Sequence, residues 1–108
     1  MPPHLLRTFP GFYRDSLTPA LAQILSEKAA VVYVDCDLYE SAKDVLGFIP
    51  KFLQVGTVIV FDDWDCYWSD PARGERRAWR EFLEANPHTH FEEICRIPRS
   101  IAFVCTKA

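Results

Sequence analysis

Two short apolar runs stand out in the hydrophobic pattern of the chain, at residues 31–34 (Val-Val-Tyr-Val) and 57–61 (Thr-Val-Ile-Val-Phe). Each run is too short for a helix and rich in β-branched and aromatic residues, which is typical of a parallel strand covered on both faces. A helical pattern lies between the two runs. The sequence therefore predicts a strand, helix, strand unit whose right-handed crossover makes the strands parallel neighbours.

Helical spacing of apolar residues predicts a further helix on either side of this unit. Before it, Thr18 and Pro19 form an N-cap and first-turn pair, and they predict a helix over residues 19–28. After it, a helix is expected over residues 74–85, where the apolar side chains share one face.

The crossover helix carries its own start and stop signals. Ser41 followed by Asp44 resembles a capping box at its start. Pro50 lacks an amide hydrogen, so it should kink or divide the helix and leave residues 51–54 as a separate turn. We expect Gly56 to end this helical segment before the second strand.

The end of the chain has the pattern of a β-hairpin. Residues 89–96 and 100–106 are strand-like and close in sequence, so they are expected to pair antiparallel. The predicted fold class is α/β, with two parallel strands and an antiparallel hairpin in one mixed sheet with flanking helices. No repeat or polar linker divides residues 1–108, which predicts a single domain.

Composition and charge narrow the classes of function that the chain can have. A net charge of -3 offers no basic surface for nucleic acid. No apolar stretch approaches the roughly 20 residues that span a bilayer, and the first residues lack a signal-peptide profile, so a cytoplasmic protein is expected. The four cysteines lack paired spacing and are expected to be reduced thiols, although Cys95 and Cys105 could face each other across the hairpin.

Both predicted parallel strands end in aspartates. Asp35 follows the first strand, and Asp62 and Asp63 follow the second. The carboxyl ends of parallel neighbours meet at one edge of a sheet, about 4.8 Å apart, so these side chains can reach one cation. Because side chains alternate along a strand, Asp62 and Asp63 can converge only if the chain turns between them.

The alternative is that these aspartates only cap loops, as aspartates after strands often do. However, three acidic groups without an obvious cation among them are costly to hold together, unless a metal or a raised pKa neutralises them. An all-oxygen ligand set without histidine or cysteine favours Mg²⁺, Mn²⁺ or Ca²⁺ over Zn²⁺. The sequence therefore predicts a divalent cation at Asp35, Asp62 and Asp63.

Four segments together resemble the C-terminal half of macrocin-type O-methyltransferases. They are Phe-Pro-Gly-Phe-Tyr-Arg-Asp-Ser-Leu (9–17), Val-Asp-Cys-Asp-Leu-Tyr-Glu-Ser (34–41), Val-Gly-Thr-Val-Ile-Val-Phe-Asp-Asp-Trp (55–64) and Gly-Glu-Arg-Arg-Ala (74–78). The resemblance implies half of a class I methyltransferase fold, which is Rossmann-like. It also implies magnesium-dependent methyl transfer from S-adenosylmethionine to a hydroxyl of a sugar or other small molecule.

The resemblance also implies roles for single residues. By position, Asp35, Asp62 and Asp63 match the family's metal-binding aspartates. The metal would orient the acceptor hydroxyl and lower its pKa. Asp35 or Asp37 would assist as the catalytic base, and the sequence does not separate the two.

Three aromatic residues follow the second acidic motif. They are Trp64, Tyr67 and Trp68, in a loop at the C-terminal end of a predicted strand. Such a loop is a common place for a binding site, so these rings are candidates for stacking on a sugar or aromatic acceptor. Packing within the loop is the alternative.

The chain departs from the family at its start. The family's first three strands, with the glycine-rich loop that holds the cofactor, would lie before Met1, and the four glycines present form no such loop. The S-adenosylmethionine site is therefore expected to be incomplete and the chain inactive by itself. Without those strands, the strand before Asp35 has a free edge that invites pairing.

Two functions are consistent with this departure. In the first, the chain is the metal-binding half of an O-methyltransferase and works as a homodimer or with a missing N-terminal half. In the alternative, it is a non-catalytic metal-binding or interaction module that dimerises through its exposed strand edge. The expected partners are a small-molecule acceptor and this second polypeptide, rather than nucleic acid or a membrane.

Overall fold

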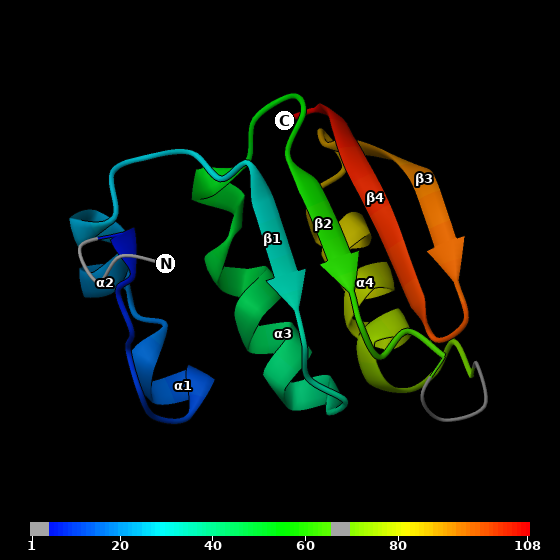
Figure 1. The fold of residues 1–108 in the computed structure, drawn as a ribbon, viewed down its shortest axis with the longest axis horizontal. Helices are drawn as coiled ribbons and strands as arrows, with labels where there is room; N and C mark the ends of the chain where they lie inside the picture. The colour runs from blue at the N-terminus through cyan, green and yellow to red at the C-terminus, as the bar shows by residue number, and fades with distance from the viewer. Residues whose placement is uncertain (1–4, 66–69) are drawn as a thin grey trace.

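Four strands form one mixed sheet in the computed structural model, which describes residues 5–65 and 70–108 (Figure 1). The strand order is β1-β2-β4-β3. β1 and β2 are parallel, whereas β4 is antiparallel to both β2 and β3. The strands are β1 (Val31–Val34), β2 (Val58–Phe61), β3 (His90–Ile97) and β4 (Ser100–Lys107). This arrangement confirms the predicted α/β class with a mixed sheet.

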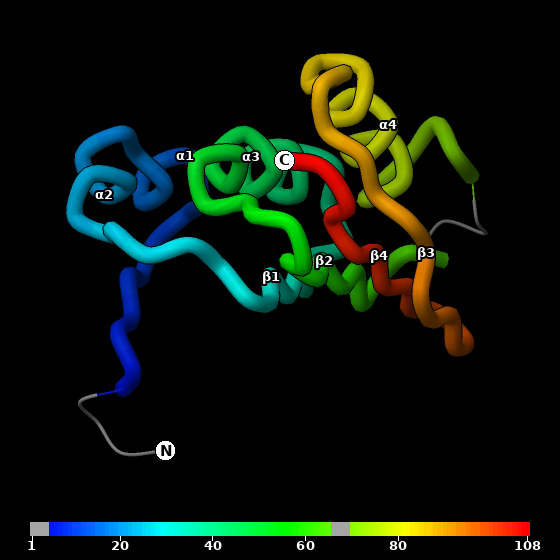
Figure 2. The backbone as a smooth tube through the Cα atoms, turned by 90° about the horizontal axis from the view of Figure 1, so that it is seen from above, coloured from blue at the N-terminus to red at the C-terminus, as the bar shows by residue number. Residues whose placement is uncertain are grey.

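The helices of the described chain all lie on the same side of this sheet (Figure 2). α3 and α4 cover one face, while α1 and α2 lie beyond the edge formed by β1 (Figure 1). None of these helices is long and apolar enough to cross a membrane. The helices are α1 (Tyr13–Ser16), α2 (Pro19–Ile24), α3 (Tyr39–Phe48), the short 3-10 helix η2 (Pro50–Phe52) and α4 (Gly74–Ala85).

The helix boundaries confirm some predictions and correct others. α4 has the predicted bounds, and Pro50 divides the crossover as expected, although the short helix after the break is η2 rather than residues 51–54. α2 ends at Ile24, well before residue 28. The segment after α2 leaves the helix because it bonds to η2, where the amide of Ala29 donates to the carbonyl of Phe52 (2.8 Å).

The predicted capping box at the start of the crossover helix is wrong. α3 begins at Tyr39, and its N-cap is Leu38, which makes no side-chain capping bond. The Tyr39 hydroxyl donates to Glu81 of α4. The guanidinium of Arg77, also in α4, lies 3.9 Å from the centre of the Tyr39 ring. These contacts with α4 position the first turn of α3, and a local capping motif does not contribute.

The described residues cover the sheet on one face only, which corrects the prediction that the parallel strands are buried on both. Val34, Ile59 and Phe61 point to the helices and are buried. On the opposite face Val31 is 61% exposed and Tyr33 is 57% exposed. β1 is also an edge strand in the described sheet. The structure thus has an open apolar face and a free parallel edge.

A cluster of aromatic rings fixes α4 to the sheet. Trp79 lies 5.2 Å from Phe61 of β2 and 5.0 Å from Phe103 of β4, measured between ring centres. Buried aromatic pairs of this kind add about 0.5–1.5 kcal/mol beyond their burial. This packing holds the first turn of α4 near the C-terminal end of β2.

The hairpin register separates the two cysteines that could have faced each other. Cys105 lies opposite Phe91, whereas Cys95 lies opposite Ala102. Among the described residues, Cys36, Cys95 and Cys105 are free thiols. The fourth cysteine, Cys66, lies outside the described residues.

Two valines of β1 test the one-sided cover of the sheet. Val34→Ala removes two methyl groups from the core and should lower the free energy of unfolding by about 2 kcal/mol. Val31→Ala removes the same groups from the open face and should change it by less than about 0.5 kcal/mol. Urea denaturation measures both, and equal losses would mean that the open face is covered in solution.

Candidate metal centre

The ends of β1 and β2 bring three aspartates together. Val34 pairs with Phe61 in the parallel register, so Asp35 and Asp62 leave the sheet at the same level. In the described part of the chain, one carboxylate oxygen from each of Asp35, Asp62 and Asp63 lies within 4.8 Å of the other two. Three oxygens at this spacing can surround one hard cation.

The chain turns directly after β2, as convergence of the two neighbouring aspartates requires. The amide of Asp62 still follows the sheet and donates to the carbonyl of Val34 (3.0 Å). The amide of Asp63 leaves the sheet and donates to the Glu75 side chain (3.0 Å). The predicted condition for a shared site is therefore met.

The pKa values of the three carboxyl groups move in different directions. A hydrogen bond with Asp62 is the main cause that raises the pKa of Asp35. A hydrogen bond from the Tyr33 hydroxyl is the main cause that lowers the pKa of Asp62. Burial, and then the charges of Asp62 and Asp35, raise the pKa of Asp63. Such opposed shifts are expected of close carboxylates that resist being charged together.

One basic side chain lies near the cluster, although no obvious cation stands among the aspartates in the sequence. The charge of Arg99 contributes to the lowered pKa of Asp62 and partly opposes the rise in the pKa of Asp63. Arg99 sits in the β3–β4 turn with a φ of 76°. The hydroxyl of Ser100, next in the chain, donates to the carbonyl (3.0 Å) and to Oδ1 (3.3 Å) of Asp62. The pairing of β4 with β2 brings this turn to the site.

Glu75 belongs to the site but was not among its predicted residues. It is buried, and loss of solvent contact raises its pKa from 4.5 to about 8. The sequence does hold a signal for it, because Glu75 shares a helical face with the apolar Ala78, Trp79 and Phe82. An acidic residue on an apolar helix face is unusual and marks a group with a specific partner.

Tyr33 was also not predicted. Its hydroxyl interacts with Asp62, and this hydrogen bond is the main cause that raises the pKa of Tyr33 to about 12. Strand alternation could have indicated it, because Tyr33 and Asp35 are two residues apart and a strand points such residues to the same side.

The other predicted site residues lie at the margin of the cluster or outside it. Asp37 is exposed and is not one of the three converging aspartates. Trp64 is 8% exposed, with its ring 5.2 Å from Phe61 and the Arg76 guanidinium 5.0 Å from its centre. These contacts favour the packing alternative for Trp64. The proposed stacking residues Tyr67 and Trp68 lie outside the described residues.

The family model described as macrocin-O-methyltransferase (TylF) matches residues 4–99, which is most of the chain. The chain belongs to this family. The match confirms the resemblance predicted from the four sequence segments. No curated protein sequence matches this TylF-family chain.

Solved structures of the methyltransferase CalS11 are similar to this TylF-family chain. The structure described as calicheamicin methyltransferase is 30% identical, covers 87% of this chain and has a TM-score of 0.66. The apo structure, described as a TDP-rhamnose 3′-O-methyltransferase of calicheamicin biosynthesis, is 29% identical, covers 87% and has a TM-score of 0.65. The match covers 35% and 38% of those chains, so this chain spans little more than a third of their length.

Burial of Glu75 makes stability depend on pH. Its pKa is about 8 in the folded chain and should be near 4.5 when unfolded, so the unfolded state loses its proton first. The contribution of Glu75 to the free energy of unfolding should therefore fall as pH rises from about 4.5 to about 8.

Glu75→Gln removes this dependence. The variant should gain stability over the wild type between pH 5 and pH 8 in thermal denaturation, whereas Glu84→Gln, at an exposed position of the same helix, should not. A constant difference between Glu75→Gln and wild type across this range would contradict the raised pKa.

Proposed function

We propose that the chain supplies the metal-binding part of an S-adenosylmethionine-dependent O-methyltransferase that acts on a hydroxyl of a sugar or other small molecule. The observation that carries the proposal is the convergence of three aspartate oxygens within 4.8 Å in a chain of the TylF family. The description of CalS11 as a TDP-rhamnose 3′-O-methyltransferase supports a sugar acceptor.

The donor set fits a hard divalent cation. Asp35, Asp62 and Asp63 offer only carboxylate oxygens, which suit Mg²⁺, Mn²⁺ or Ca²⁺. A bound cation of this kind would orient the acceptor hydroxyl and lower its pKa. Asp35 is exposed, so an acceptor can reach the cluster from solvent.

The two candidate bases have different environments. Asp35 belongs to the cluster, and a carboxylate that holds a cation is a weak base because the positive charge lowers its pKa. Asp37 is exposed and outside the three converging aspartates, yet its charge still raises the pKa of Asp63. We therefore propose that Asp35 acts mainly as a metal ligand. Asp37 would be the base that takes the proton from the hydroxyl of the substrate.

The residues present do not fit S-adenosylmethionine. Gly11, Gly47, Gly56 and Gly74 are isolated in sequence and form no glycine-rich phosphate or nucleoside loop. The chain also spans little more than a third of the CalS11 chains. In our proposal a further polypeptide segment supplies the cofactor site, and no step of the transfer is assigned to this chain alone.

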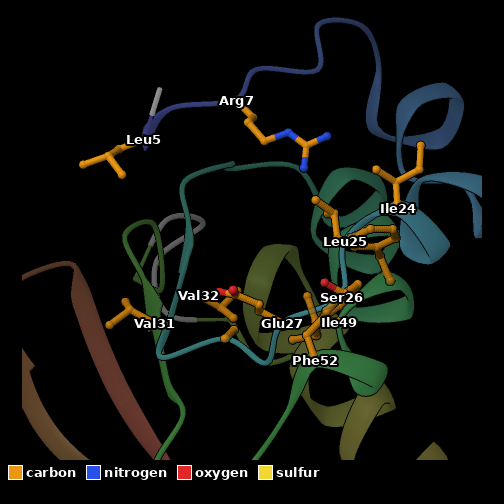
Figure 3. Close-up of a pocket in the computed structure, with 12 residues that line it drawn as sticks. Leu5, Arg7, Ile24, Leu25, Ser26, Glu27, Val31, Val32, Ile49 and Phe52 are labelled. Atoms are coloured by element: carbon orange, nitrogen blue, oxygen red, sulfur yellow. The ribbon is translucent and has the colours of Figure 1, made fainter. Parts of the chain in front are cut away.

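The edge of β1 is the proposed place for that segment. A cavity of about 660 Å³ runs along it, between the N-terminal segment, the end of α2 and the start of β1 (Figure 3). Its walls are mainly apolar and include Leu5, Ile24, Val31, Val32 and Phe52. An unpaired parallel edge beside an apolar groove accepts an added strand well.

A second candidate function rests on the same exposed surface. The open face carries Val31 and Tyr33, and a free apolar edge can pair with a second copy of the chain as readily as with another segment. In this alternative the chain is a dimeric metal-binding or interaction module without catalytic activity.

Metal binding is testable on the chain alone. Mg²⁺ at 100 times its dissociation constant should raise the free energy of unfolding by about 2.7 kcal/mol, which thermal denaturation detects. Asp35→Asn and Asp62→Asn should each abolish this rise and leave the fold intact, because each removes a ligand charge. Asp37→Asn is the matched control, and Mg²⁺ should stabilise this variant as much as it stabilises the wild type. A wild-type chain that Mg²⁺, Mn²⁺ and Ca²⁺ all fail to stabilise would contradict the metal site.

Calorimetry and light scattering separate the two candidate functions. With Mg²⁺ present, S-adenosylmethionine should give no heat of binding to the isolated chain, and clear binding would contradict an incomplete cofactor site. A monomer mass is expected if another segment completes the sheet. A dimer mass that Val31→Lys reduces to a monomer would favour the dimeric module, because the added charge lies on the open edge.

A further inference from the structure

Glu75 is the only buried acidic side chain among the described residues, with 1% of its surface exposed. It is the second residue of α4. Its Oε1 accepts a 3.0 Å hydrogen bond from the amide of Asp63, while its Oε2 has no hydrogen-bond partner in the described chain. Burial of a carboxyl group with one unpaired oxygen costs free energy. Core packing alone therefore does not account for Glu75.

The Glu75 side chain reaches the backbone of both acidic motifs. The amide of Asp63 donates to it at the end of β2, and the backbone amide of Cys36, next to Asp35, stabilises its carboxylate. Its own helix is held firmly, since Trp79 packs on the sheet. One rigidly placed side chain thus holds the backbone at the end of β2 and lies close to the acidic motif that follows β1.

The hydrogen bond from the Asp63 amide to Glu75 lies at the point where the chain turns away from β2. The Asp62 amide continues the sheet and bonds to Val34, whereas the Asp63 amide turns away from the sheet to Glu75. In a continuing strand Asp62 and Asp63 would point to opposite faces. The turn lets both side chains converge with Asp35.

We propose that Glu75 is a positioning residue of the metal site, which holds the backbone of Asp63 so that Asp35, Asp62 and Asp63 converge on one cation. This inference rests on the proposed metal-binding function. Glu75 acts through the backbone and does not bind the cation. Groups that orient metal ligands typically change metal affinity by about 10–100-fold when they are removed.

Titration calorimetry with MgCl₂ on the full chain tests the proposal. Glu75→Ala removes the acceptor and should weaken Mg²⁺ binding by about 10–100-fold. Glu75→Gln keeps an oxygen that can accept from the Asp63 amide, so its affinity should stay close to the wild type. The NMR signal of the Asp63 amide proton should move upfield in Glu75→Ala and remain in place in Glu75→Gln, because the hydrogen bond is lost only in the first.

Ile49→Val is the control for a purely structural effect. It removes one buried methylene near the opposite end of α3, so it should lower the melting temperature without changing Mg²⁺ affinity. If Glu75→Ala does not fold, Glu75→Asp replaces it in the experiment. The shorter side chain cannot reach the amide of Asp63, so this variant should also bind Mg²⁺ more weakly than the wild type.

Wild-type affinity in Glu75→Ala, or in Glu75→Asp where it is used, would overturn the positioning role. An equal loss in Glu75→Gln and Glu75→Ala would also overturn it, because the charge rather than the hydrogen bond would then matter. A wild-type chain that does not bind Mg²⁺ would instead overturn the proposed metal-binding function, and this inference with it.

Discussion

The register between β1 and β2 is the constraint on which the acidic edge depends. In this parallel pair Val34 lies opposite Phe61, so both strands end at one level and Asp35 and Asp62 leave the sheet side by side. A slip by one residue would move an aspartate by about 3.3 Å and turn its side chain to the other face. The same register buries Val34 and Phe61 under the helices. Core packing and site geometry therefore depend on one set of hydrogen bonds.

Close carboxylates repel one another, and the structure offsets this repulsion in several ways. Asp62 receives hydrogen bonds from Tyr33 and Ser100 and lies near the charge of Arg99. Glu75 adds a further carboxyl group beside the same backbone, and burial raises its pKa to about 8. The edge is thus held together by polar contacts from β1, the β3–β4 turn and α4. A divalent cation would relieve the remaining repulsion, which links metal binding to the stability of this edge.

The open face and the free edge of β1 are the parts of the described sheet that nothing packs against. Parallel sheets in α/β proteins normally have both faces covered, because their strands are apolar on both sides. Here α3 and α4 cover one face, while Val31 and Tyr33 on the other remain exposed. The solved relatives are longer than this chain, and the match accounts for 35% and 38% of them. The two functions proposed above differ in what would pack on this open face.

The local pattern of residues along the sequence determined much of the fold and part of the acidic site. The sequence alone predicted the mixed sheet, α4, the break at Pro50 and the meeting of the two acidic motifs, because each depends on residue periodicity, a missing amide or the topology of a crossover. Only the tertiary structure decided where α3 begins and that Arg99 and Glu75 lie beside the aspartates. These features depend on contacts between residues far apart in the chain, whose energies outweigh local preferences. The spacing of the sequence marks Glu75 as unusual on its helix face, but it does not show which backbone groups the side chain contacts.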